Sequence, residues 1–355
     1  PEGFQAAYKQ FVEGGWNALP FDPDFGGQGL PWALATAVQE MWQAANLSFG
    51  LCPLLTAGTV ELLQAHGSDR QKTDYLARLI SGEWTGTMNL TEPQAGSDVG
   101  ALKTRAQRNG DHYLITGQKI YITWGEHDCA DNIVHMVLAR LPDAPEGTRG
   151  ISLFLVPKYI VNEDGSPGPR NDLRCVSIEH KLGIKASPTA VMSYGDSGGA
   201  VGYLVGEENK GMACMFTMMN NARLAVGLQG VAIAERATQQ ARAYAFERVQ
   251  SKPLEGTSGA KTIIAHPDVR RMLATMKART EAARALTYWA AAAMDRAKRE
   301  PDEETRAAAQ ARLDLLIPIA KAWCTDVGCE VASLGVQVHG GMGFIEETGA
   351  AQHYR

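Results

Sequence analysis

The sequence has no excess of charge of one sign and no long hydrophobic run. Its 34 Lys and Arg residues nearly balance 39 Asp and Glu residues, for a formal net charge of −5. Such a balance offers no general attraction to nucleic acid or anionic lipid, so we expect neither as a partner. No run reaches the roughly 18 apolar residues that a membrane span needs, and no signal peptide opens the chain. We therefore expect no membrane span and a cytoplasmic location.

Cysteine motifs and the common nucleotide and metal motifs are also missing. The six cysteines show no CxxC pair, whereas a disulfide framework or a zinc site needs tighter, repeated spacing. They are Cys52, Cys129, Cys175, Cys214, Cys324 and Cys329. We expect buried free thiols in a reducing compartment, and no metal site. The sequence has no GxGxxG after a strand and no Walker A, HExxH or EF-hand pattern, so Rossmann-type dinucleotide binding is unsupported.

What is present is ordinary globular composition, with 45% hydrophobic and 21% charged residues over 355 positions. That length predicts two or three domains with ample core. The sequence begins at Pro1 without a Met and stops at Arg355 directly after a dense motif, so we expect it to be part of a longer chain. The first and last domains are then expected to be incomplete.

Three compositional zones predict three domains. Residues 1–84 show helical spacing, residues 85–206 change to β-branched and partly alternating segments, and residues 207–355 return to long amphipathic helices. The expected helices are 32–46, 59–67, 222–250, 266–300 and 304–340, and the expected strands are 112–123, 132–141, 150–160 and 190–195. The predicted fold class is α+β: an N-terminal helical domain, a central antiparallel β-barrel or sandwich, and a C-terminal helix bundle.

The most unusual stretch is MNLTEPQAGSDVGALKTRA at residues 88–106. It places Thr91, Glu92, Ser97 and Asp98 around a proline and two glycines. One interpretation is a polar loop in which Thr and Ser make local turn bonds. The other is a loop that presents hydroxyls and backbone donors to a planar polar ligand, because its small residues allow close approach.

Two further stretches leave similar alternatives open. Tyr121 and Thr123 end a predicted strand two residues apart, so alternation places a stacking surface beside a hydroxyl, unless the strand is half-buried in ordinary packing. Gln337, Gly340, Gly341 and Gly343 end the last long helix and leave backbone amides open. Their amides could form a phosphate cradle, or they could form an ordinary helix C-cap with a glycine turn.

Taken in order, these stretches resemble the acyl-CoA dehydrogenase family over essentially the whole chain. TEPQAGSD is similar to the family's TEPxAGSD motif, QKIYIT to QKxWIT, ERVQ to a variant of ERxxF, and QVHGGMGF to QxxGGxGF. The stretch FTMMNNARL and the tail GGMGFIEETGAAQHYR resemble the longer bacterial members. The resemblance implies a flavoenzyme that introduces a trans double bond between Cα and Cβ of an acyl-CoA thioester.

The resemblance also implies a set of binding residues for FAD and for the substrate. The Leu90–Thr91 backbone and the Thr91 hydroxyl would face the flavin ring, Tyr121 would pack against it in place of the commoner Trp, and Thr123 would bond near its N5. The implied pyrophosphate and adenosine contacts across a dimer interface are Arg248, Gln337, Gly340 and Gly341. The implied substrate contacts are Ser97, which would touch CoA, and Asn220 and Arg223 on the helix lining the CoA channel.

The general base of the reaction is expected beyond Arg355. In most family members it is a Glu in a Y-E-G-T segment shortly after the Q-H-Y-R-D stretch, and Glu346 and Glu347 precede that position. Some relatives place the base immediately before the arginine that corresponds to Arg223, where this sequence has Ala222. We therefore expect the 355-residue chain by itself to carry out little or no dehydrogenation.

The implied partners are an acyl-CoA substrate and an electron-transfer flavoprotein, with a homodimer or homotetramer as the assembly. An acyl-CoA oxidase remains an alternative, since sequence does not decide whether oxygen reaches the reduced flavin. A second alternative is a non-catalytic member that binds flavin and nucleic acid. That branch would need a basic stripe on the helix bundle, and residues 277–300 alternate both signs.

Overall fold

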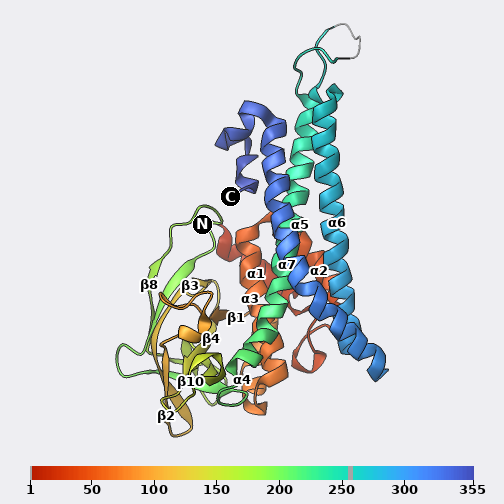
Figure 1. The fold of residues 1–355 in the computed structure, drawn as a ribbon. Coiled ribbons are helices and arrows are strands. Elements are labelled where there is room, and N and C mark those ends of the chain that lie inside the picture. The colour runs from red at the N-terminus through yellow and green to blue at the C-terminus, as the bar shows by residue number, and fades with distance from the viewer. Residues whose placement is uncertain (1, 255–258) are drawn as a thin grey trace. The chain divides into compact units, whose positions relative to one another are not determined.

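A computed structural model describes residues 2–254 and 259–355. The chain forms two compact units: the first contains residues up to 30, 48–181 and 185–222, and the second contains 31–47, 182–184 and 223–355. The predicted fold class is confirmed, because helical N-terminal and C-terminal parts flank a central β domain (Figure 1). The two units are described one at a time below.

The helices of the first unit are α1 (Phe4–Glu13), α3 (Leu47–His66), α4 (Asp69–Ser81) and the beginning of α5 (Gly211–Glu247). Local sequence explains the limits of α4. Ser68 and Gln71 form a capping box at its start, with each side chain bonded to the other's backbone N–H. Gly82 ends the helix in the left-handed conformation, with φ 90°, that glycine adopts without strain.

Helix α3 is longer than its sequence pattern predicts. Only residues 59–67 show clear helical spacing, whereas α3 begins at Leu47 and contains Pro53. Gly50 and Pro53 lower helix propensity, but burial of thirteen residues of α3 outweighs it. Among the described residues, α3 alone is long and apolar enough to cross a membrane, and 72% of its most apolar window is buried inside the fold. That degree of burial is typical of a core helix.

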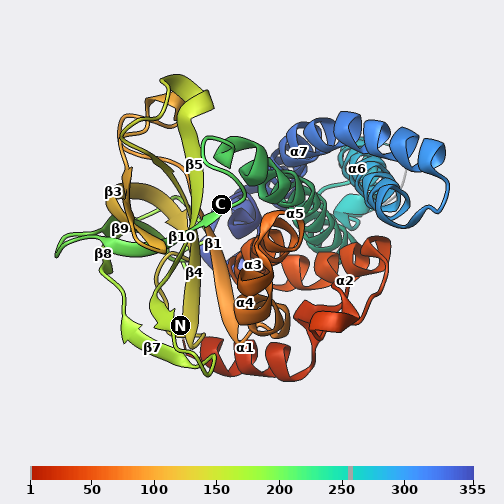
Figure 2. The ribbon, with the colours of Figure 1, turned by 90° about the horizontal axis from the view of Figure 1, so that it is seen from below.

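The central β domain is an eight-stranded sheet with the order β1-β4-β5-β10-β3-β9-β8, in which β2 pairs with β3 and β4 (Figure 2). The strands are β1 (Trp84–Asn89), β2 (Arg105–Asn109), β3 (His112–Thr123), β4 (Asn132–Arg140), β5 (Ile151–Pro157), β8 (Leu173–Ile178), β9 (Thr189–Tyr194) and β10 (Ala200–Val205). Strands β6 (Tyr159–Val161) and β7 (Pro167–Arg170) form a separate pair. The pairing is antiparallel, as predicted, except that β1 and β2 pair with β4 in parallel.

Burial along the strands shows where the core of the β domain lies. Every residue of β5 is buried, and so is every residue of β4 before Arg140, which is the pattern of strands covered on both faces. Helix α3 packs against β1 at Gly86, where an added Cβ would lie 2.1 Å from Thr59 Oγ1. This close approach holds the interior of α3 directly against the interior of β1.

The second unit is a helix bundle of α2 (Trp32–Ala45), the later part of α5, α6 (Pro267–Arg299) and α7 (Glu303–His339). Small residues let α5 and α7 approach closely. A Cβ at Gly230 would lie 2.1 Å from the Cys324 carbonyl oxygen, and one at Gly328 would lie 2.9 Å from Gly230 Cα. The core is correspondingly rich in alanine, as the composition of these helices suggests.

A partly buried ionic network joins three helices of the bundle. Arg284 of α6 donates two hydrogen bonds to Glu40 Oε1 of α2, at 2.9 and 2.8 Å, and one of 2.8 Å to Glu235 Oε2 of α5. The Tyr288 hydroxyl donates to Glu40 Oε2 at 2.8 Å. Charged side chains thus join α2, α5 and α6 at this place, whereas small alanine side chains pack between the helices in the rest of the bundle core.

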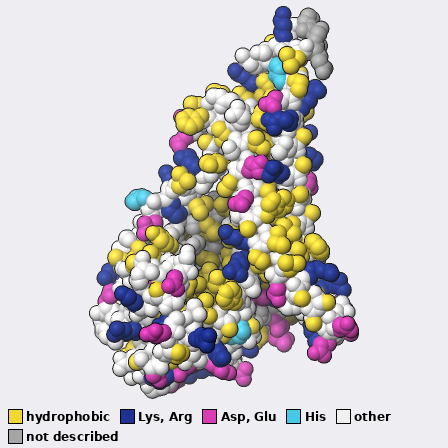
Figure 3. Space-filling model, in the orientation of Figure 1, with side chains coloured by type: hydrophobic (Ala, Val, Ile, Leu, Met, Phe, Trp, Pro, Cys, Tyr) yellow, Lys and Arg dark blue, Asp and Glu magenta, His cyan; other side chains and the backbone are white. Residues whose placement is uncertain are grey.

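The surface of the bundle carries hydrophobic side chains over α6 and α7 (Figure 3). They are Trp289, Leu315, Ile319 and Trp323, each more than a third exposed. The three residues of α7 recur every four positions and so share one face of that helix.

The prediction of buried cysteines is only partly right. All six are free, and Cys52, Cys214 and Cys324 are buried, but Cys129 and Cys175 are half-buried and Cys329 is exposed. Cys329 follows Cys324 by five residues, which turns it by roughly 140° around α7. A residue so placed leaves the core face that Cys324 occupies.

Candidate functional site

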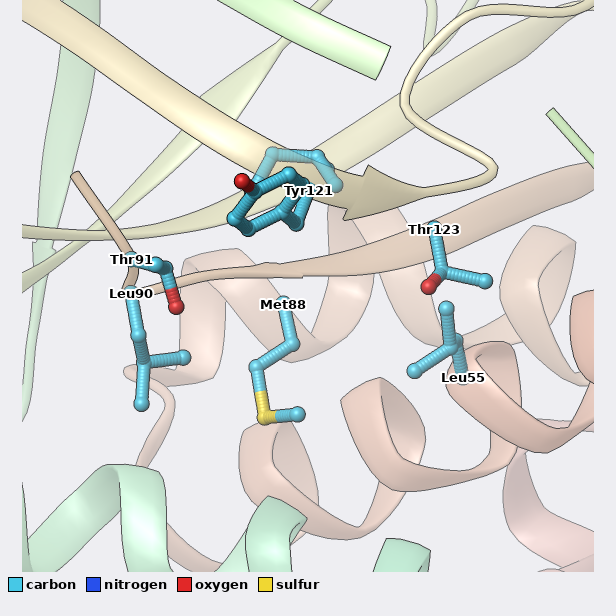
Figure 4. Close-up of a pocket in the computed structure, with 7 residues that line it drawn as sticks. Leu55, Met88, Leu90, Thr91, Tyr121 and Thr123 are labelled. Carbon is cyan, nitrogen blue, oxygen red and sulfur yellow. The ribbon is translucent and has the colours of Figure 1, made fainter. Parts of the chain in front are cut away.

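The first unit contains a cavity of about 150 Å³ at the end of β1. Its lining comes from α3, from β1 and the segment after it, and from the end of β3 (Figure 4). The lining residues are Leu55, Met88, Leu90, Thr91, Tyr121, Ile122 and Thr123. The walls are therefore mostly apolar, with two threonine hydroxyls and one phenol, which suits a flat ligand with apolar faces and a polar edge.

A β-bulge in β3 delivers Tyr121 to this cavity. The register with β9 shifts between Lys119 and Ile122, and Tyr121 has φ 60°, a left-handed conformation that costs a non-glycine residue energy. Tyr121 and Thr123 line one cavity, as alternation suggested, although the strand between them is irregular. The Tyr121 side chain is not packed as ordinary strand packing would require, since the residue is 62% exposed. A strained backbone that presents an exposed ring favours a binding role.

The segment Leu90–Thr91 is held by its carbonyl groups. Lys119 Nζ donates to the Leu90 carbonyl oxygen at 3.0 Å, and the Ile120 N–H donates to the Thr91 carbonyl oxygen at 2.9 Å. In a trans peptide the N–H points opposite to the C=O, so the Thr91 N–H points away from Lys119. The segment thus holds the Thr91 N–H on the side opposite Lys119, and Thr91 is one of the residues that line the cavity.

Glu92 anchors the loop behind this segment. Its carboxylate accepts hydrogen bonds from the Lys103 N–H at 2.6 Å and from the Thr104 N–H and hydroxyl at 3.1 and 2.5 Å. It also accepts from Gln94 Nε2 at 2.6 Å and from Lys119 Nζ at 2.8 Å. Glu92 and Lys119 are both buried. They form an ion pair with a full set of partners around the carboxylate.

Burial and charge act together on the pKa values of this pair. Burial alone would raise the pKa of Glu92, but the charge of Lys119 and the donated hydrogen bonds outweigh it and hold the pKa at about 2. Burial lowers the pKa of Lys119 to about 8, against the opposing effect of Glu92. The lowered pKa of Glu92 means that its carboxylate stays ionised at neutral pH.

The sequence-based interpretation gave Lys119 no role, although a signal was present. Ile115, Gly117 and Lys119 are in phase along β3, and Ile115 and Lys119 are both fully buried. A lysine on the buried face of a strand needs a partner charge. The nearest acidic candidate in the preceding motif is Glu92, which the structure brings to it.

Other predicted residues lie away from this cavity lining. Ser97 is on the exposed part of the loop after β1, and Asn220 is half-buried on α5 in the first unit. Arg223 is half-buried on α5 in the second unit. Arg248 is exposed directly after α5, where its N–H donates to the Tyr244 carbonyl oxygen at 2.8 Å.

The glycines after α7 form a helix cap in the second unit. Gly340 has φ 61°, and its N–H donates to the Gln337 carbonyl oxygen, so this amide is already used within the turn. Gly343 packs so closely that an added Cβ would lie 2.2 Å from the Val336 carbonyl oxygen. Gly341, by contrast, has nothing within 4 Å of an added Cβ. The C-cap interpretation describes this turn, and Gly341 is its open position.

No group of three or more His, Cys, Asp or Glu side chains within residues 2–254 and 259–355 is arranged to hold a metal ion. The Glu92–Lys119 ion pair does not line the cavity, but Lys119 contacts the carbonyl oxygen of Leu90, which does. The polar side chains that line the cavity are those of Thr91, Tyr121 and Thr123, and each carries a hydroxyl.

The N-terminal helices, the central β domain with its cavity and the C-terminal helix bundle follow one another in the order that defines a three-domain class of oxidoreductases. Three family descriptions match along the chain: acyl-CoA dehydrogenase, N-terminal domain over residues 2–83, middle domain over 87–196, and C-terminal domain over 209–355. The chain belongs to the acyl-CoA dehydrogenase family.

Individual relatives agree with this assignment. The 3-methylmercaptopropionyl-CoA dehydrogenase of Ruegeria pomeroyi is 57% identical over 357 residues, covering all of this chain and 60% of the relative. The short-chain specific acyl-CoA dehydrogenase of Clostridium acetobutylicum is 32% identical over 96% of this chain and 80% of its own length. A solved acyl-CoA dehydrogenase from Bacillus anthracis, complexed with FAD, has a TM-score of 0.83 at 28% identity and covers 99% of this chain and 58% of that structure.

The chain spans about 60% of the length of several curated relatives that it matches. What those relatives do is therefore carried to this protein only as a proposal.

Proposed function

We propose that the protein containing this chain is an FAD-dependent acyl-CoA dehydrogenase that desaturates an acyl-CoA thioester between Cα and Cβ. The observation that carries the proposal is the cavity in which Tyr121, Thr91 and Thr123 meet. Two family motifs supply these three residues, and the exposed, left-handed Tyr121 has no packing role that would explain its conformation.

The residues of the cavity fit a flavin ring. The Tyr121 ring offers a stacking face, while the Thr91 N–H, the Thr91 hydroxyl and the Thr123 hydroxyl offer hydrogen bonds to a polar edge. When bound, FAD would supply the acceptor for the hydride that leaves Cβ. In the second unit we assign Arg248, Gln337, Gly340 and Gly341 to the pyrophosphate and adenosine, and an added Cβ would meet nothing within 4 Å at either of these glycines.

We assign Ser97, Asn220 and Arg223 to the CoA moiety of the substrate. These residues bind and orient, and none of them takes the α proton. Ala222, which precedes Arg223, carries a methyl group that accepts no proton, and Glu346 already pairs with Arg355 at 2.9 Å.

The test uses the purified full-length protein. We expect a yellow protein whose flavin absorbance bleaches under anaerobic conditions on addition of 3-methylmercaptopropionyl-CoA or butyryl-CoA. A colourless, folded protein that cannot be reconstituted with FAD would overturn the proposal. A yellow protein that no acyl-CoA reduces would leave flavin binding intact and overturn the dehydrogenase activity.

We propose an electron-transfer flavoprotein as the electron acceptor. Parallel assays of oxygen consumption and of electron-transfer flavoprotein reduction decide between this acceptor and an oxidase. Fast oxygen consumption with acyl-CoA would assign the protein to the oxidases instead. A cytoplasmic location and a homodimeric or homotetrameric assembly stay predictions.

A further inference from the structure

We propose that the buried Lys119–Glu92 pair is a positioning device that sets the direction of the Thr91 N–H at the cavity. The inference rests on the proposed function in one respect, namely that a flavin ring binds where Thr91 and Tyr121 meet. Neither Lys119 nor Glu92 lines the cavity, so both act through the Leu90–Thr91 peptide.

The first step is the clamp on the Leu90 carbonyl group. Lys119 Nζ reaches this oxygen at 3.0 Å while it contacts Glu92 Oε1 at 2.8 Å. A charged donor holds an acceptor more firmly than a neutral one. Because the peptide is planar and trans, fixing the Leu90 C=O also fixes the opposite direction of the Thr91 N–H.

The second step is the anchoring of Lys119 itself. A lysine side chain is flexible, and a single contact would not define its position. Glu92 removes this freedom, because its carboxylate is held by two backbone N–H groups and by the hydroxyl of Thr104. The ammonium group is therefore placed by a rigid acceptor, and the Leu90 carbonyl is placed by the ammonium group.

The third step concerns why ionic groups occupy this place. An ion pair taken out of water is a poor source of stability, and apolar residues of similar volume are often as good or better. Arg174–Asp196 of the β domain lies at the surface and Lys158–Glu126 is only partly buried, whereas the side chains of Lys119 and Glu92 are 0% and 3% exposed. A costly pair that holds one carbonyl beside a cavity is better explained by positioning than by stability.

The consequence for a bound ring is electrostatic. A backbone donor fixed at the polar edge of a flavin stabilises negative charge that develops there on reduction. A donor whose direction is not fixed stabilises this charge less, because it must first be reoriented. The pair therefore affects both the affinity for FAD and the reduction potential of the bound flavin.

The experiment compares Lys119→Met with a matched control, Lys158→Met, in the full-length protein. Lys158 also forms a mostly buried ion pair in the β domain, with Glu126, and does not line the cavity. Two readouts are used: hydrogen–deuterium exchange of residues 88–92 in the FAD-free protein, and affinity, visible spectrum and reduction potential with FAD. The second does not require turnover.

For Lys119→Met we expect faster exchange in residues 88–92, an FAD dissociation constant higher by about tenfold, and a lower flavin reduction potential. For Lys158→Met we expect wild-type values in all of these. If Lys119→Met does not fold, Glu92→Gln/Lys119→Met removes both charges with little change of shape and is expected to show the same three effects.

Wild-type exchange in residues 88–92 of the folded variant would overturn the proposal, and so would faster exchange with unchanged FAD affinity and potential. Failure of the wild-type protein to bind FAD is a different result, because it overturns the proposed function. In that case the exchange readout still decides whether Lys119 positions the segment.

Discussion

Tyr121→Gly should weaken FAD binding at the cavity with little loss of fold stability. Trp124→Gly is its matched control. Both residues are aromatic, both follow or lie in the β3 bulge, and both adopt a left-handed backbone, with φ 60° and 56°. They differ in burial, because Tyr121 is 62% exposed and Trp124 is 2% exposed. Trp124 packs against Phe4 and His127, with ring centroids 5.3 and 5.0 Å apart.

The magnitudes follow from these differences. At Tyr121 glycine relieves about 1 kcal/mol of left-handed strain but adds a comparable entropy cost on folding. A tyrosine side chain has a surface of roughly 200 Å², and about a third of it is buried at Tyr121. Burial of that third stabilises the fold by about 1.5 kcal/mol, which the variant loses. The free energy of unfolding should therefore fall by only about 1.5 kcal/mol. Removing the buried Trp124 should cost about 4 kcal/mol.

The assay measures thermal unfolding of the FAD-free protein and FAD affinity for each variant. We expect Tyr121→Gly to lower the melting temperature by a few degrees and to weaken FAD binding about tenfold, because it removes a stacking face. Trp124→Gly should lower the melting temperature by roughly 5 °C, more than twice the shift of Tyr121→Gly, because about 4 kcal/mol is lost against the unfolding entropy of a 355-residue chain.

Two results would refute this reasoning. Equal losses of melting temperature in the two variants would make Tyr121 a structural residue. Wild-type FAD affinity in Tyr121→Gly would show that its ring does not contact the cofactor.

Three further predictions concern the rest of the chain. The pKa of Glu92 is lowered to about 2 from an ordinary value of 4.5, so its ionisation stabilises the fold above about pH 4.5, and this contribution is lost as the pH falls toward 2. Melting temperatures of wild type and Glu92→Gln should accordingly converge on acidification, and a constant difference would contradict the assignment. Arg284→Met should lower the free energy of unfolding by about 2 kcal/mol, since it leaves the buried carboxylate of Glu40 without its counter-charge and with the Tyr288 hydroxyl still bonded to it, while Arg271→Met, which breaks an exposed pair with Asp268, should cost less than about 0.5 kcal/mol in a urea titration. A thiol reagent such as DTNB should modify Cys329 first in the native protein, because it is the exposed thiol; loss of the fast phase in Cys329→Ser checks this, and a persisting fast phase would point to Cys129 or Cys175.

Much of the fold could be predicted because its signals are local. The predicted strand 112–123 coincides with β3, and the predicted helices 266–300 and 304–340 match α6 and α7 within one residue at each end. Alternation and helical spacing depend only on neighbours along the chain, so a short window contains the information. The motifs around Thr91 and Tyr121 were visible for the same reason.

Other features depended on partners far along the chain. Helix α3 includes Pro53 because its apolar residues are buried, which no local pattern shows. The parallel pairing of β1 with β4 joins residues about fifty positions apart. Neither could be predicted, since the favourable energy comes from contacts that exist only in the folded chain.

The sequence by itself determined the order of helical and β zones, the family, and the motifs that contain Thr91, Tyr121 and Thr123 of the cavity lining. Tertiary structure alone decided how those residues are presented. The bulge that turns Tyr121 outward and the pair of Lys119 with Glu92 both require two segments to meet, 27 positions apart in the case of the pair. Side-chain identity is written in the sequence, but the direction of a peptide N–H is set by whatever holds the opposite carbonyl.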